Sequence, residues 1–165
     1  MDLEEAIINK RSVRCFNKKP VNIDDIQVLL MAAVWAPSGL NNQPWRFKVV
    51  NEEIRKERLA GFTKYSYIIK GAPVSICVFL DKTAVYDREK DIMAIGACIQ
   101  NILLAAHAMN LGSCWLGEIL NKKDEVRELL NVSPEFELMA VISLGYPKGI
   151  PCKVSRKKME SFILR

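Results

Sequence analysis

The chain has 165 residues, of which 50% are hydrophobic and 26% charged, and this length and composition are typical of one globular domain with its own core. We therefore expect a single domain over residues 1–165. The net charge of +5 raises the question of nucleic-acid binding. However, basic residues alternate with acidic ones, as in "NEEIRKERL", which is typical of solvated helix faces. Two basic clusters stand out, "NKRSVR" near the start and "CKVSRKK" near the end, and neither has interleaved aromatic residues. We therefore expect no nucleic-acid partner.

The N-terminus and the cysteine content favour a cytoplasmic protein. "MDLEEAIINKRS" is acidic and then amphipathic, which is not the order of a signal peptide. No uninterrupted apolar run reaches the ~18–20 residues of a membrane span, so we expect no membrane contact. The cysteines are scattered without a C-x-x-C pair and are predicted to be free thiols: Cys15, Cys77, Cys98, Cys114 and Cys152. Of these, Cys77 and Cys98 lie in apolar stretches typical of a core.

The first half of the chain predicts alternating helices and strands. A helix is expected over residues 2–9, with acidic residues in the first turn, where the helix dipole favours them. A second helix is expected over residues 22–36, with Asn22 as its N-cap. Further elements are a strand over 46–50, a surface helix over 51–62 and a strand over 72–80, whose nearly continuous apolar sequence is typical of a strand covered on both faces.

The second half is built around an apolar helix. Residues 91–109 are apolar almost all round, which predicts a helix through the core. Gly112 is the expected helix stop, followed by a short extended segment. A surface helix over 121–130, a strand over 137–147 and a basic, then apolar tail complete the chain. The whole pattern predicts an α+β domain, a sheet with helices packed on it.

The chain lacks the common catalytic signatures. It contains no G-x-S-x-G, H-E-x-x-H, G-x-x-x-x-G-K-[ST] or G-x-G-x-x-G sequence. Its only histidine, His107, falls within the apolar helix and is expected to pack or cap there, so no structural metal site is expected. Without a nucleophile–base pair, an enzyme of this sequence would rely on a cofactor for its chemistry.

Three separate segments suggest which cofactor. Basic residues follow the first helix in "KRSVR" and recur in "SRKK" near the end, and together with a serine hydroxyl they could hold one phosphate. The loop "APSGLNNQPW" offers amides to the edge of a heteroaromatic ring, and "GSCWLGE" offers backbone groups and a flat tryptophan. Each segment alone also fits a plain structural role: solvated charges, a helix stop or a core aromatic.

Together, "KRSVRCF", "APSGLNNQPWRF", "NLGSCWLG" and "SLGYP…SRKKMESF" occur in the order and spacing of the nitroreductase family, which the chain resembles over nearly its whole length. The resemblance implies an α+β fold with a mostly antiparallel central sheet, flanked by helices, and a long apolar central helix. It also implies an intertwined homodimer with FMN at the subunit interface, reduced by NADH or NADPH.

The resemblance also implies which residues bind the cofactor. Lys10, Arg11, Ser12 and Arg14 match the segment that holds the FMN phosphate and ribityl chain, and Arg156 matches a C-terminal phosphate ligand. Pro37, Ser38, Gly39 and Asn41 match the loop that reaches the flavin from the other subunit, whereas Gln43, Pro44 and Trp45 support its shape. Trp115, Leu116 and Gly117 match the segment over one edge of the flavin ring. No side chain is expected to act as a general acid.

The chain also departs from the family pattern. Longer members insert a helical excursion where this chain has only "DKTAVYDREKD", so the walls of a substrate pocket do not carry over. Lys64 is a loose counterpart of a flavin-contacting lysine, and Gly117 stands where longer members often have glutamate, which puts a role for Glu118 in doubt. The expected activity is ping-pong reduction of a small acceptor such as a nitroaromatic or quinone. The alternatives are a flavin-binding redox sensor or storage protein, or another subtype such as a reductive dehalogenase or a flavin-fragmenting enzyme.

Overall fold

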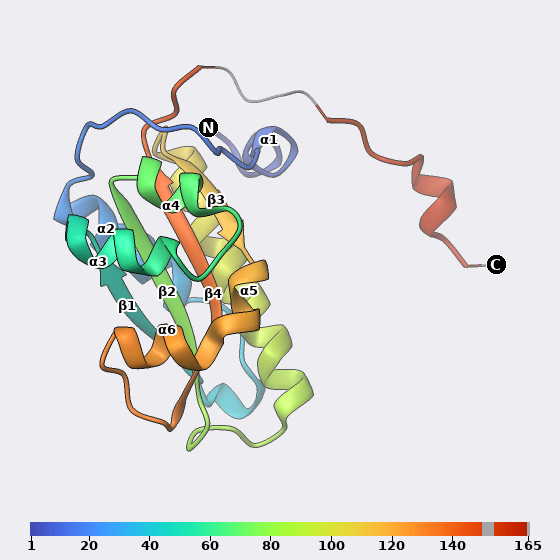
Figure 1. The fold of residues 1–165 in the computed structure, drawn as a ribbon. Helices are drawn as coiled ribbons and strands as arrows, with labels where there is room; N and C mark the ends of the chain where they lie inside the picture. The colour runs from blue at the N-terminus through green and yellow to red at the C-terminus, as the bar shows by residue number, and fades with distance from the viewer. Residues whose placement is uncertain (150–153, 165) are drawn as a thin grey trace.

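A computed structural model describes residues 1–149 and 154–164 (Figure 1). The strands β1 (Trp45–Val50), β2 (Val74–Asp81), β3 (Gly112–Leu116) and β4 (Phe136–Gly145) form one four-stranded sheet in the order β1-β2-β4-β3. All neighbouring pairs are antiparallel, with Val78 opposite Ala140 and Cys114 opposite Ser143. The predicted α+β fold with an antiparallel sheet is therefore confirmed.

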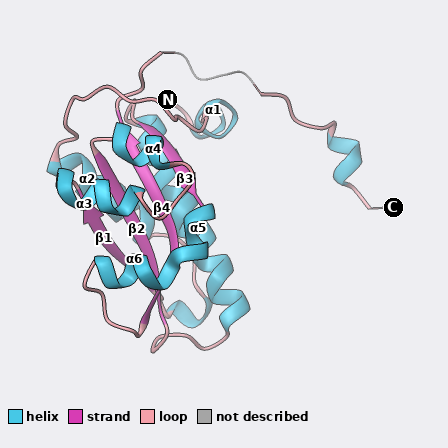
Figure 2. Cartoon of the chain, viewed as in Figure 1, coloured by secondary structure: helices cyan, strands magenta, loops and turns pink. Residues whose placement is uncertain are grey.

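Helices cover both faces of the sheet (Figure 2). They are α1 (Leu3–Asn9), α2 (Ile23–Val34), α3 (Glu53–Ala60), α4 (Ser66–Gly71), α5 (Arg88–Ala108) and α6 (Lys123–Leu129), with short 3-10 turns η1 (Gly39–Asn41), η2 (Glu118–Lys122) and η3 (Met159–Phe162). All eight residues of β2 are buried, as its continuous apolar sequence predicted.

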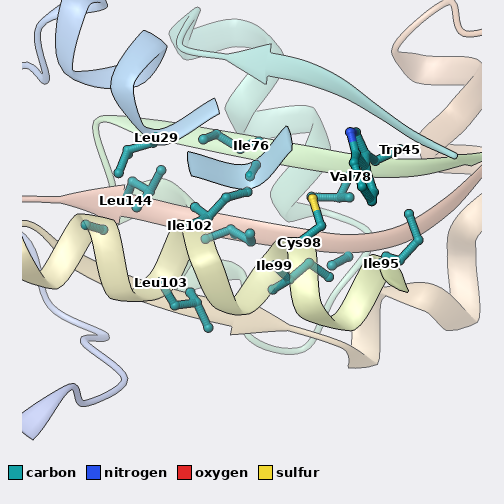
Figure 3. Close-up of a cluster of buried hydrophobic side chains, with 14 of the residues drawn as sticks. Leu29, Trp45, Ile76, Val78, Ile95, Cys98, Ile99, Ile102, Leu103 and Leu144 are labelled. Atoms are coloured by element: carbon teal, nitrogen blue, oxygen red, sulfur yellow. The ribbon is translucent and has the colours of Figure 1, made fainter. Parts of the chain in front are cut away.

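A hydrophobic core lies on each face of the sheet. On one face, α2 and α5 pack on side chains from the central strands (Figure 3). This core includes Leu29 of α2, Ile76 of β2 and Ile102 of α5. On the other face, the core joins side chains from α3, α4 and α6 to Phe79 and Val141. Burying large aliphatic side chains on both faces stabilises the sheet by roughly 1.5–3 kcal/mol per side chain.

The helix ends follow local sequence chemistry, with one correction. Asn22 caps α2, as predicted, because its side-chain oxygen accepts a hydrogen bond from the Asp24 amide (3.2 Å). Asp87 caps α5, which therefore begins at Arg88, earlier than expected. The predicted glycine stop is wrong: Asn110, with φ 59°, takes the left-handed conformation after α5, and Gly112 begins β3. Helix α4 was not predicted.

Helix α5 has the length and mean hydropathy of a membrane span, although no uninterrupted apolar run in it is that long. Eight of its side chains, among them Ile95, Cys98 and Ile102, are buried inside the domain, and this packing accounts for its composition. Burial raises the pKa of Cys77 and Cys98 to about 12, as expected of core thiols. Cys15 is exposed and Cys114 buried, both as free thiols, whereas Cys152 lies outside the described residues.

A partly buried carboxylate ties the N-terminus of α5 to the sheet. Arg88 donates to both carboxylate oxygens of Glu137 on β4 (2.8 and 3.1 Å), and Lys123 of α6 donates to the same group (2.7 Å). The hydrogen bonds from Arg88 are the largest cause that lowers the pKa of Glu137 from 4.5 to about 2, with Lys123 adding to the effect. Helix α5, helix α6 and strand β4 are thus linked through the Glu137 carboxylate.

Because ionised Glu137 is favoured in the folded state, its contribution to stability is fully present above the unfolded pKa of 4.5 and lost as pH falls towards the folded value of about 2. We expect Glu137→Gln to lower the free energy of unfolding at pH 7 by about 1–2 kcal/mol, allowing for solvent screening of the exposed partners. The deficit should shrink between about pH 4.5 and pH 2 in urea denaturation. The exposed Glu125→Gln is the matched control, and an equal deficit in both variants would contradict the assignment.

Candidate functional site

An open pocket of about 590 Å³ lies beside the C-terminal half of α5. It is lined by Lys10, Arg11, Ser12 and Arg14, which are expected to hold the FMN phosphate and ribityl chain, by Arg156, the expected C-terminal phosphate ligand, and also by Cys15, Gln100, Lys148, Gly149 and Val154. Residues from the two ends of the chain therefore meet here.

The segment that follows α1 is held along the open edge of β3. The Val13 amide donates to the Ser113 carbonyl (2.9 Å), and Ser12 bridges Ser113 in parallel register. Gly112 permits this approach, because a Cβ there would overlap the Val13 side chain. Val13 and Phe16 are buried, and Arg14 and Cys15 between them line the pocket.

The pocket concentrates positive charge without an acidic partner. Its lining includes five basic residues and no acidic one, and none of the ion pairs within the described ranges involves Lys10, Arg14 or Arg156. Burial lowers the pKa of Lys10, and the Arg156 guanidinium lowers it further. Arg11 donates to the Ile8 and Lys10 carbonyls (2.6 and 2.8 Å), which fixes its guanidinium at the end of α1. A compact anion would relieve this repulsion.

The edge of β3 continues beyond the pocket with free hydrogen-bonding groups. In an antiparallel ladder the backbone groups of alternate residues point to the same side. Since the Ser113 carbonyl points away from β4 to Val13, the Trp115 amide also points to the open edge. Trp115 lies two residues, roughly 7 Å, further along the strand and its side chain is exposed, whereas Leu116 is buried. Gly117, also exposed, follows the strand.

The loop over residues 36–45 lies away from this pocket in the same chain. Asn42 donates to the Asp91 carboxylate at the N-terminus of α5 (2.7 Å), whereas the pocket touches α5 at Gln100. The nine steps along the helix from Asp91 to Gln100 span roughly 14 Å. Pro37, Ser38, Gly39 and Asn41 are thus not brought to the basic residues within one chain. The Ser38 hydroxyl instead accepts a hydrogen bond from the Gln43 amide (3.1 Å), which closes the loop.

Lys64 is not among the residues that line the pocket. Its ammonium lies over the Tyr65 ring, 5.4 Å from the centroid, and its amide donates to Glu118 (3.3 Å). Glu118 also accepts a hydrogen bond from the Thr63 hydroxyl (2.5 Å), so it joins this turn to the end of β3. That contact gives Glu118 a structural role.

Sequence reasoning missed several residues that line the pocket, of which Lys148 is the most informative. It directly follows the "SLGYP" motif, and its amide donates to the Cys15 carbonyl (3.0 Å), so it adds a cation beside the 10–14 segment. His107 is half-buried in the last turn of α5 and does not line the pocket. Within the described ranges, no group of three His, Cys, Asp or Glu side chains could hold a metal ion.

Comparisons with known proteins identify the family of this chain. The family model of the nitroreductase family matches residues 7–64 and 59–146. A candidate NADH dehydrogenase/NAD(P)H nitroreductase of Archaeoglobus fulgidus is 36% identical over 148 residues, covering 87% of this chain and 84% of that protein. The iodotyrosine deiodinase of Thermotoga neapolitana is 31% identical over 175 residues, covering 91% of each.

The fold agrees equally well with a solved structure. A candidate nitroreductase from Desulfovibrio desulfuricans, crystallised in complex with FMN, superposes with a TM-score of 0.95 at 40% identity. The match covers 100% of this chain and 96% of that one. This chain belongs to the nitroreductase family.

Proposed function

We propose that the chain acts as one domain of an FMN-dependent oxidoreductase that takes hydride from NADH or NADPH and reduces a small acceptor in the cytoplasm. The observation that carries this proposal is the pocket in which five basic side chains gather without an acid. The FMN complex of the Desulfovibrio desulfuricans relative, 40% identical, supports FMN as the ligand. An oxidoreductase role agrees with membership of the nitroreductase family.

The described residues fit a flavin mononucleotide in two places. Lys10, Arg11 and Arg156 offer charged donors to a phosphate, joined by the Ser12 hydroxyl and Arg14. A phosphate held there would direct the ring along the open edge of β3, where the Trp115 amide is available as a donor and Leu116 and Gly117 follow. The cationic lining also favours negative charge on a bound ring.

When bound, FMN supplies the ring that accepts hydride and returns reducing equivalents to a second molecule. The chain's own part is to hold the phosphate, orient the ring and supply positive charge. Since donor and acceptor would use the same exposed ring face in turn, we infer ping-pong exchange. The lining residues within 1–149 and 154–164 include no carboxylate or imidazole as a proton donor.

We further propose that the active form is a homodimer that completes each site across the interface. Exposed apolar side chains lie on α2, at its C-cap, on the first half of α5 and in the tail, and a second copy would bury them: Met31, Trp35, Ile92, Met93, Phe162 and Leu164. Beyond Arg156, which lines the pocket, the end of the tail with η3 extends away from the rest of the chain (Figure 1). A second copy could cover these surfaces and bring Pro37, Ser38, Gly39 and Asn41 to the partner's flavin. We propose that Lys64 contributes to the flavin site only indirectly, through the contact of its amide with Glu118.

The relative named iodotyrosine deiodinase supports a second candidate function, reductive dehalogenation of an iodinated phenol. Both functions would use the same cofactor site, so only the acceptor distinguishes them. Iodide release from an iodinated phenol under anaerobic conditions would favour the second candidate.

Turnover separates an enzyme from a flavin-binding sensor or storage protein. We expect the purified protein to be yellow, to be bleached rapidly by NADH or NADPH under anaerobic conditions, and to regain its colour with a nitroaromatic or quinone. Stopped-flow absorbance measures both half-reactions, and intersecting rather than parallel double-reciprocal lines would contradict ping-pong exchange. A flavin that neither nucleotide reduces faster than free FMN would contradict the enzymatic function.

Complementation tests the shared site. We expect Arg11→Ala and Asn41→Ala homodimers each to lose most of their activity, because one weakens the pocket and the other the loop. Mixing the two under subunit exchange should restore activity, since one site of each mixed dimer would have an intact pocket and an intact loop. Mass spectrometry of differently tagged chains verifies the mixed dimers. If these form without recovery of turnover, the shared site is wrong.

A further inference from the structure

A fully buried carboxylate lies outside the basic pocket, in the first turn of α5. Asp91 has no exposed surface, and the ion pairs found in residues 1–149 and 154–164 do not include it. Its oxygens accept from the Asn42 side-chain amide (2.7 Å), the Tyr86 amide (3.1 Å) and the Asp87 amide (3.4 Å). A buried charge is costly unless it is hydrogen-bonded, so these donors are what stabilises Asp91 in place.

The loop that contains Asn42 has an unfavourable backbone conformation. Leu40, Asn41 and Gln43 have φ values of 54°, 55° and 48°, in the left-handed region that non-glycine residues rarely adopt. The Leu40 side chain is 85% exposed, so burial of Leu40 within the chain does not offset the strain. Other contacts must therefore hold the loop in this shape.

Two contacts anchor the loop to the start of α5. The Asn42 amide donates both to Asp91 and to the Ala84 carbonyl (3.0 Å). The Tyr86 hydroxyl lies against Gly39 so closely that a Cβ on Gly39 would overlap it. Since the Tyr86 amide also donates to Asp91, this single carboxylate holds both anchors.

We propose that Asp91 is a positioning residue, which through Asn42 and Tyr86 holds the 38–43 loop in the shape that reaches the flavin of the partner subunit. This inference rests on the shared site proposed above. Asp91 is not among the described residues that line the pocket of its own chain, so it would act on the partner's site.

A purely structural role as a helix cap is already filled by a neighbour. The Asp87 carboxylate accepts from the Lys90 amide (3.2 Å) and pairs with the Lys90 ammonium (3.1 Å). Asp87→Asn is therefore the matched control: it changes a carboxylate in the same helical turn, retains a good N-cap residue and leaves the loop's side-chain contacts alone.

The primary variant is Asp91→Asn, which keeps the size of the side chain and an acceptor for the backbone amides. The Asn42 amide would then face another amide, or would turn and lose its bond to Ala84. We expect kcat/KM to fall roughly tenfold or more, because misplaced positioning groups commonly cost this much. The visible spectrum of bound flavin should also shift, whereas Asp87→Asn should retain the wild-type rate and spectrum.

Asn42→Ala provides a second route if Asp91→Asn does not fold. It should reproduce the fall in kcat/KM. The double variant should have the same kcat/KM as Asn42→Ala alone, because both substitutions break the same contact between Asn42 and Asp91. A wild-type rate and spectrum in a folded Asp91→Asn, or in Asn42→Ala, would overturn the proposal.

Mixed dimers distinguish an effect on the partner from damage to the variant's own chain. Asp91→Asn chains mixed with Arg11→Ala chains should recover activity, because the intact pocket of the first receives the intact loop of the second. Recovery with Asn41→Ala but not with Asp91→Asn would overturn the role of Asp91 and leave the shared site standing. If neither mixture recovers although mixed dimers form, the shared site itself fails and the role of Asp91 fails with it.

Discussion

The close approach of the 10–16 segment to the open edge of β3 is the constraint on which the candidate site depends. The Val13 amide donates to the Ser113 carbonyl, and Gly112 leaves the space that Val13 occupies. This contact holds the segment along β3 with Val13 buried and with Lys10 and Arg14 lining the pocket. The same edge then presents the Trp115 amide beyond the segment, so the proposed phosphate site and the proposed ring site both depend on one strand.

The second determinant of the candidate site is positive charge, which the pocket holds despite mutual repulsion and desolvation. Burial lowers the pKa of Lys10, Arg156 lowers it further, and none of the described residues that line the pocket is acidic. The opposite arrangement occurs at the other end of α5, where Asp91 is buried among hydrogen-bond donors. A single helix thus separates a cationic pocket from a loop held by a buried aspartate. In a dimer, these two ends could meet across the interface.

Much of this arrangement was predictable from local sequence chemistry. Continuous apolar residues predicted the buried strand β2, and Asn22 predicted the start of α2, because both signals lie within a few residues. Helix α4 escaped prediction because its six residues are too few for a clear period, and its stability comes from packing on the second core. The contact of Asn42 with Asp91 joins residues 49 positions apart, and no local pattern encodes it.

Titration of the apoprotein with FMN and with riboflavin shows whether the basic pocket holds the phosphate of FMN. We expect about one FMN per chain and much weaker binding of riboflavin, which lacks the phosphate. In Arg11→Ala/Arg156→Ala, FMN affinity should fall roughly 100-fold or more while riboflavin affinity stays unchanged, because each lost charged contact is worth about 1.5–3 kcal/mol. Equal affinity of the wild-type protein for FMN and riboflavin would mean that the pocket does not bind the phosphate.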